Sequence, residues 1–207
     1  MYLLDNRCII CEKSSDKNIC QNCIDSFLSF PKENYLKYSN NFYFNNIYSL
    51  FNFDKNLKKV IHFYKFNNYR ELSTLFATLF IERFGKEFFN SYDYIVITPL
   101  HKNKLKKRGF NQTTLIIEKI VEKDKIFLGI ERVLKTKQQS LLFSREDRVK
   151  NLDNSFLFKE SCQQKVENKK ILIFDDIFTT GTTLNSLAKE FYFAKAKEID
   201  VITLGVA

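Results

Sequence analysis

Two stretches of the chain place apolar residues three and four positions apart. This spacing brings side chains onto one face of an α-helix, so each stretch predicts an amphipathic helix. The apolar positions are Leu57, Val60, Ile61 and Tyr64 in the first stretch and Leu72, Leu75, Phe76, Leu79 and Phe80 in the second. Similar patterns predict helices over residues 112–121 and 184–193.

Short apolar runs between these stretches predict buried strands. Residues 94–98 form a compact β-branched run, and residues 171–174 and 199–204 have the same character. A further short strand is expected near residues 47–51. Strands that alternate with helices favour an α/β fold, in which a mostly parallel, doubly wound sheet carries helices on both faces.

The length of the chain, 207 residues, allows one ordinary domain and a small appendage. We predict a cysteine-containing segment over residues 1–30, a connector over residues 31–54 and the α/β domain over residues 55–207. Hydrophobic residues make up 44% and charged residues 28% of the chain, a balance typical of a folded globular protein.

The composition also bears on location and partners. No apolar run approaches the ~20 residues that cross a bilayer, and the first residues contain no signal-peptide core, so we expect a cytoplasmic protein without membrane insertion. The formal net charge of +9 favours partners rich in phosphate, either nucleic acid or phosphorylated small molecules.

Four of the five cysteines form two Cys-x-x-Cys pairs near the N-terminus. Cys8 and Cys11 make the first pair, and Cys20 and Cys23 make the second after eight intervening residues. Two such pairs can complete a tetrahedral zinc site, and because protein fills all four positions we predict a structural metal. The alternatives are redox-active thiols or a chance spacing. Cys162 stands alone in a polar stretch and is expected to take no part.

A polar cluster follows the strand predicted over residues 171–174. It consists of Asp175 and Asp176, and then Thr179, Thr180, Gly181, Thr182 and Thr183, which lead into a predicted helix. Ligands of parallel sheets bind beyond the carboxyl ends of the strands, and N–H groups at a helix N-terminus attract anions. We predict a ribose 5-phosphate pocket, with the two acids on the sugar hydroxyls. The alternative is that these residues only cap the helix.

Two basic stretches are candidates for binding pyrophosphate, a nucleic-acid backbone, or both. The first contains Lys104, Lys106, Lys107 and Arg108 and is followed by Asn111, and the second contains Arg145 and Arg148. The alternatives are a solvated charged face for the first stretch and, for the second, pairing of the two arginines with Glu146 and Asp147 on an exposed helix. Aromatic residues between Phe42 and Tyr69 could stack on bases, although their helical spacing favours the core.

Residues 171–183 resemble the phosphoribosyl-pyrophosphate (PRPP) signature of type I phosphoribosyltransferases. The resemblance implies a parallel-sheet fold and transfer of ribose 5-phosphate from PRPP to a nitrogen nucleophile with Mg²⁺. It also implies ribose contacts from Asp175 and Asp176 and 5-phosphate contacts from residues 179–183. Enzymes acting on 6-oxopurines usually carry an aspartate where this chain has Thr179, which argues against hypoxanthine or guanine as acceptor.

Other segments are similar to the ComF family of competence proteins. They are Pro-Leu-His at residues 99–101, Arg-Gly-Phe-Asn-Gln at residues 108–112, and Lys65-Phe66, where the family commonly has Lys-Tyr. The spacing of Gln139, Leu141, Arg145, Arg148 and Asn151 also follows the family. The resemblance covers nearly the whole chain and implies the handling of single-stranded DNA in natural transformation, together with a helicase-type ATPase.

The sequence is therefore compatible with two functions. The first is a competence protein that handles incoming single-stranded DNA and has a phosphoribosyltransferase-type pocket for PRPP and Mg²⁺. The second is an active phosphoribosyltransferase of nucleotide or amide metabolism that is unrelated to DNA uptake. The sequence does not identify the acceptor nucleophile.

Overall fold

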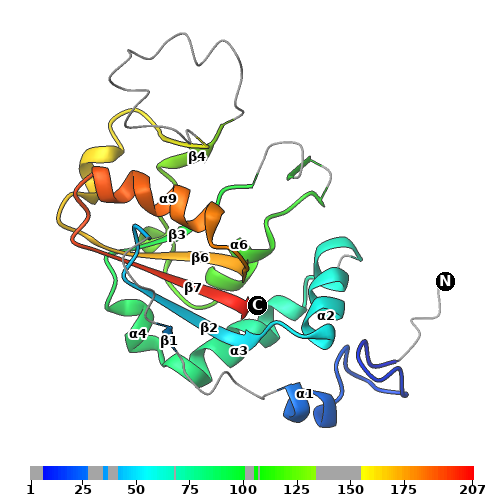
Figure 1. Ribbon diagram of the computed structural model, residues 1–207. Coiled ribbons are helices and arrows are strands. Elements are labelled where there is room, and N and C mark those ends of the chain that lie inside the picture. Colours follow the sequence, from blue (N-terminus) through cyan, green and yellow to red (C-terminus); the bar gives the residue numbers. More distant parts are fainter. Residues whose placement is uncertain are drawn as a thin grey trace.

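The computed structural model describes residues 7–27, 35–36, 42–67, 69–100, 105–106, 108–133 and 155–207. Within them, a five-stranded sheet has the order β1-β2-β7-β6-β3 (Figure 1). Its strands are β1 (Tyr35–Leu36), β2 (Asn46–Asn52), β3 (Tyr94–Ile97), β6 (Lys170–Phe178) and β7 (Glu198–Val206). Neighbouring strands from β2 to β3 are parallel, and β1 is antiparallel to β2.

Helices cover both faces of this sheet. The helices that pack on one face include α2 (Lys55–Phe66), α3 (Leu72–Phe84), α4 (Lys86–Asn90) and α6 (Gln112–Ile117), and Leu172 and Phe174 of β6 contribute to the same core. On the other face, Ile171 and Ile173 pack with α9 (Thr182–Phe193) and with the antiparallel pair β4 (Ile130–Arg132) and β5 (Phe156–Phe158). The mostly parallel, doubly wound α/β prediction is confirmed.

The predicted helices and strands are present, with some different limits. The apolar stretches at residues 57–64 and 72–80 form α2 and α3, and α2 begins after Asp54, whose carboxylate accepts a 2.7 Å hydrogen bond from the N–H of Leu57. The helix predicted over residues 112–121 ends at Ile117 and continues as turns. The strand near residues 47–51 is β2, inside the predicted connector, and it pairs with β7. The division of the chain into three segments stays a prediction.

Strand β6 is longer than the apolar run that predicted it. It continues through Asp175 and Asp176 to Phe178, because Asp175 pairs with Thr203 and Phe178 with Val206 of β7. The prediction that both acids follow the strand is therefore wrong, because they are residues of the strand itself, close to its carboxyl end. Side chains alternate between the two faces of a strand, so the two acids point to different sides of the sheet.

The cysteine segment packs against the helical face that contains α2 and α3. Cys8, Ile9, Ile19 and Cys23 belong to the same buried cluster as Phe76 of α3. Helix α1 (Gln21–Phe27) follows the second cysteine pair, and short 3₁₀ turns occur at η1 (Lys123–Lys125) and η2 (Gln163–Val166). Among the described residues, no helix is both long enough and apolar enough to cross a membrane.

Candidate functional site

The four N-terminal cysteines converge on one point. Their sulfur atoms all lie within 4.8 Å of one another, and the Sγ atoms of Cys11 and Cys20 are 3.8 Å apart. A tetrahedral site with Zn–S bonds of about 2.3 Å places its sulfurs about 3.8 Å apart, so the cluster fits Zn²⁺. The predicted four-cysteine cluster is confirmed as a group that could hold a structural metal.

The cysteine thiols differ in their readiness to ionise. Burial disfavours the thiolate of Cys8, but hydrogen bonds from backbone N–H groups outweigh it and lower its pKa to about 6; the N–H of Cys20 lies 3.4 Å from its Sγ. Burial raises the pKa of Cys23 to about 12, and the neighbouring thiols and the Cys8 charge add to this effect. A cation at the centre would remove this conflict, because it stabilises all four thiolates.

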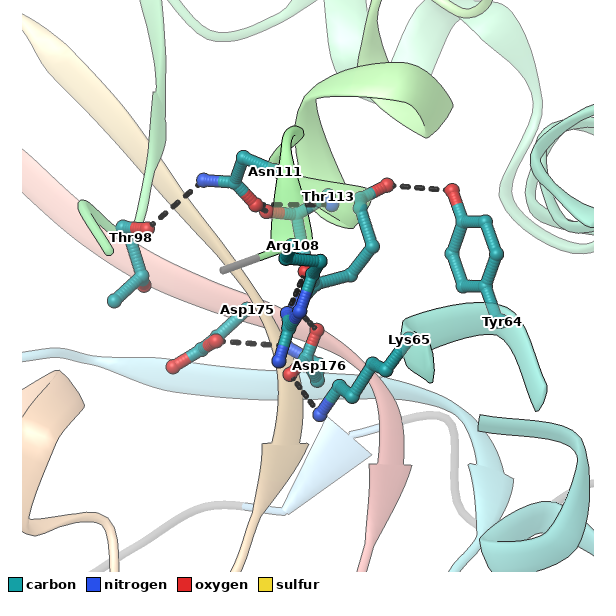
Figure 2. Close-up of polar contacts among 9 residues, drawn as sticks. Tyr64, Lys65, Thr98, Arg108, Asn111, Thr113, Asp175 and Asp176 are labelled. Carbon is teal, nitrogen blue, oxygen red and sulfur yellow. Dashed lines mark hydrogen bonds and ion pairs between the residues drawn. The ribbon is translucent and has the colours of Figure 1, made fainter. Parts of the chain in front are cut away.

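The acidic pair lies at the carboxyl end of β6, between the ends of β3 and β7. Leu172 and Phe174 face α2 and α6, so the alternation of the strand turns Asp176 to that side as well. Asp175 lies on the opposite side of the strand, and Figure 2 shows its carboxylate pointing away from Lys65 and toward Thr98. One Asp175 oxygen accepts a 2.8 Å hydrogen bond from the backbone N–H of Asp176.

The carboxylate of Asp176 is held by residues from two helices (Figure 2). Lys65 of α2 forms an ion pair with one oxygen, and Gln112 of α6 donates a 2.5 Å hydrogen bond to the other. Arg108 donates in turn to the side-chain oxygen of Gln112, and the Tyr64 hydroxyl donates a 2.6 Å bond to the Gln112 carbonyl. The Lys65 and Asp176 side chains are only 17% and 14% exposed, so this pair is poorly screened by water.

Asp175 has no comparable cationic partner among these contacts, and its ionisation is correspondingly costly. Burial is the main cause that raises its pKa, and the charge of Asp176 adds to it; the Asp176 N–H, Lys65 and the Thr98 hydroxyl partly oppose them. The result is a pKa of about 7. The pair therefore contains one carboxylate neutralised by a lysine and one that carries a proton more readily than an ordinary aspartate.

The threonine loop connects the acidic pair to α9. Gly181 adopts a left-handed conformation (φ 72°), and a Cβ there would lie 2.7 Å from the ring of Phe178, so only glycine fits without rearrangement. The hydroxyls of Thr180 and Thr182 are 2.9 Å apart. Thr179, Thr180 and Thr182 are exposed and Thr183 is half-buried, so these side chains can reach a ligand at the start of the helix.

The basic candidates are only partly described. Lys104, Lys107, Arg145 and Arg148 lie outside the described residues, as do Gln139, Leu141 and Asn151. Lys106 is exposed, Arg108 contacts Gln112, and Asn111 caps α6 by accepting a 3.2 Å hydrogen bond from the N–H of Thr113. The structure thus connects Arg108 to the acidic pair, and gives Asn111 a local role at the helix start.

Sequence reasoning missed Lys65, Gln112 and Tyr64 as parts of this site. In the sequence, Lys65 and Gln112 stand out only as elements of a family resemblance, and Tyr64 only as an apolar position of a helix. Their contacts with one another and with Asp176 join segments 48 and 64 residues apart in the sequence, a separation at which spacing carries no signal.

Comparison with curated proteins shows similarity to competence proteins. The chain is 29% identical to competence protein ComFC of Streptococcus pneumoniae over 157 residues, which cover 75% of this chain and 66% of that protein. It is 26% identical to ComFC of Bacillus subtilis over 141 residues, which cover 68% and 55%. These relatives support an assignment to the ComFC family. It is also 30% identical to competence protein F of Haemophilus influenzae over 110 residues.

The match to the ComFC family is partial in length. The chain spans between 47% and 66% of the length of these three curated relatives. No family model matches the chain. The family assignment therefore depends on the curated relatives and agrees with the resemblance found in the sequence.

Replacing Lys65 with methionine is expected to destabilise the fold by on the order of 3 kcal/mol, because the change leaves the Asp176 carboxylate largely buried without its ammonium partner. Urea unfolding measures the loss. Lys58→Met, on an exposed position of the same helix, is the matched control and should have little effect. Adding Asp176→Asn to Lys65→Met should restore part of the stability. Equal stability of the two lysine variants would contradict the role assigned to the pair.

Proposed function

We propose that this chain acts in DNA uptake during natural transformation, that it handles incoming single-stranded DNA, and that it binds PRPP at the carboxyl end of β6. The role in DNA uptake comes from the relatives, which are named as competence proteins. The observation that carries the pocket is the acidic pair joined by a short loop to a helix start at which Gly181 is left-handed.

Each part of this arrangement matches a part of a phosphorylated ribose. Carboxylates accept hydrogen bonds from sugar hydroxyls, and Asp175 has an oxygen on the side away from Lys65. Residues 179–183 would hold the 5-phosphate through backbone N–H groups and the threonine hydroxyls. Lys65 and Arg108 add positive charge beside the acids, which lowers the repulsion between the acidic pair and an anionic ligand.

Asp175 suits Mg²⁺ better than Asp176 does, since Mg²⁺ uses few protein ligands together with substrate oxygens and water. Asp176 faces the other side of β6 and is paired with Lys65, so Asp175 would be the protein ligand. When bound with PRPP, the metal would stabilise negative charge on departing pyrophosphate. Lys65 would keep the Asp176 carboxylate oriented whether or not the metal is present.

Single-stranded DNA would bind through the basic residues near the same edge. Lys106 and Arg108 lie in the segment that joins β3 to α6, and the chain as a whole has a net charge of +9. Phosphate contacts of this kind release counterions, so the affinity depends strongly on salt. We propose that the protein acts in the cytoplasm and that its partner is a helicase-type ATPase, as the family resemblance implies.

The second function, an active phosphoribosyltransferase unrelated to DNA uptake, uses the same pocket. Release of pyrophosphate from PRPP on addition of a nitrogen nucleophile would favour it. PRPP binding without such release, in a protein that also binds single-stranded DNA, would favour the competence function.

The DNA-binding part is tested by titrating a fluorescent single-stranded oligonucleotide at salt concentrations from about 50 to 200 mM. We expect the affinity to fall steeply over this range. Changing Lys104, Lys106, Lys107 and Arg108 to glutamine should reduce the slope of log affinity against log salt by about two to three, because each phosphate contact on a single strand contributes about 0.7.

The control for this experiment removes the same number of charges elsewhere. Lys86, Lys119, Lys123 and Lys165 are exposed residues of other segments, and changing them to glutamine should leave most of the slope. A slope that changes equally in both variants would show that only net charge matters, and would remove the basic segment from the proposal.

A further inference from the structure

Phe66, the last residue of α2, is turned outward. Its side chain is 60% exposed, whereas Leu57, Val60, Ile61 and Tyr64 of the same helix are buried. The ring lies off this buried face because position 66 is two residues beyond Tyr64, close to the opposite side of the helix. The core interpretation made from the sequence is therefore wrong for this residue. An exposed ring at this place is available to a ligand.

The exposed ring is connected to the acidic pair through Arg108. The Arg108 guanidinium carbon lies 5.4 Å from the centre of the Phe66 ring, a cation–π arrangement. The same guanidinium donates to Gln112, and Gln112 donates to Asp176. The ring of His62, one turn earlier on α2, has its centre 5.1 Å from that of Phe66. The exposed Phe66 ring is thus linked to the Asp176 carboxylate through Arg108 and Gln112.

The positions of these residues relative to the sheet decide which way a bound sugar would extend. The threonine loop opens α9, which packs on one face of the sheet, whereas α2 and α6 pack on the other. Asp176 faces α2 and α6. A sugar with its 5-phosphate at the loop and a hydroxyl at Asp176 would therefore extend across the end of β6. Its next substituent would reach the side on which Phe66 and Arg108 lie.

We propose that Phe66 and Arg108 form a stacking platform for a nucleobase, so that the pocket accepts a whole nucleoside 5′-phosphate unit. The unit is a free ribonucleotide, because the 5′-terminal sugar of a DNA strand has no 2′-hydroxyl and an esterified 3′-oxygen, and so offers the acids no hydroxyl. This inference rests on the proposed sugar-phosphate pocket and names a ligand for it. Bases stack on aromatic side chains and on guanidinium planes, and the positive charge of Lys65 and Arg108 suits the phosphate of the same ligand.

A tryptophan at position 66 would report stacking directly. The chain contains no tryptophan, so Phe66→Trp introduces a single indole fluorophore at the platform. We expect AMP to quench it and ribose 5-phosphate, which has no base, to leave it unquenched. Phe193→Trp is the control, because Phe193 at the end of α9 is 50% exposed and belongs to another surface. Quenching by AMP in Phe66→Trp but not in Phe193→Trp supports the platform, and equal quenching in both variants would overturn it.

Phe66→Ala gives a second measurement that needs no fluorophore. We expect AMP binding, measured by calorimetry, to weaken by about tenfold to a hundredfold while ribose 5-phosphate binding is unchanged. If ribose 5-phosphate binds but Phe66→Ala binds AMP as tightly as the unaltered chain, the platform is wrong and the pocket stands. If the unaltered chain binds neither ribose 5-phosphate nor PRPP, the pocket itself is wrong and the platform fails with it.

Discussion

Replacing Asp175 with asparagine is expected to stabilise the fold at about pH 8 and to abolish PRPP binding. Burial and the Asp176 charge raise the pKa of Asp175 to about 7. From about pH 4 to 7 the folded state holds a proton that the unfolded chain has released, so stability falls as the pH rises. Above about pH 7 the folded state bears the full free-energy cost of ionising Asp175. Asparagine cannot ionise, so the variant should be more stable by on the order of 3 kcal/mol, which raises the melting temperature by about 5–10 °C.

The pH dependence separates this explanation from a general packing effect. Thermal unfolding at about pH 4 should show little difference between Asp175→Asn and the unaltered chain, because both carry a neutral side chain there. Asp93→Asn should do the opposite at neutral pH. The backbone N–H of Lys170 and the Lys169 ammonium lower the pKa of Asp93, so its carboxylate stabilises the folded state.

The loss of function is measured on the same variants. PRPP binding by calorimetry should weaken at least about a hundredfold in Asp175→Asn, since a ribose hydroxyl loses its charged acceptor in a site poorly screened by water. Transformation frequency should fall in cells that carry Asp175→Asn/Asp176→Asn. PRPP affinity unchanged in the double variant would contradict the pocket assignment. A single variant that is less stable at about pH 8 would contradict the cost assigned to Asp175.

Removing the metal from the cysteine cluster is expected to destabilise the chain by on the order of 5 kcal/mol. Without a cation, the thiols near Cys8 and Cys23 cannot all ionise, and the turns that carry them lose their cross-link. The consequence reaches the main core, because Cys8, Ile9, Ile19 and Cys23 share a buried cluster with Phe76 of α3. Metal analysis should give one Zn²⁺ per chain, and a strong chelator should lower the melting temperature.

Two serine variants provide the comparison for the metal. Cys8→Ser should lose Zn²⁺ and unfold at lower temperature, because it removes one of four converging sulfurs. Cys162→Ser lies outside the cluster and should keep both the metal and the melting temperature within a few degrees. Zinc content at the unaltered level in Cys8→Ser would show that the cluster is not the metal site.

Much of the fold could be read from local patterns. The spacing of Leu57, Val60, Ile61 and Tyr64 predicted α2, and the β-branched runs predicted β3, β6 and β7. The pair β4 and β5 was not predicted. Each strand has three residues, too few to show a period, and 23 residues separate them. Their pairing is a tertiary contact that supplies its own hydrogen bonds.

The candidate site divides in the same way. The acidic pair, the threonine loop and the two cysteine pairs are each contiguous or closely spaced, so the sequence by itself determined which chemical groups are close together. The partners of those groups come from distant helices. Only the tertiary structure decided that Lys65 and Gln112 hold Asp176, that Asp175 faces the other side of β6, and that Phe66 is exposed beside Arg108. The physical reason is that ion pairing, burial and exposure depend on which elements pack together, and a local pattern does not encode that choice.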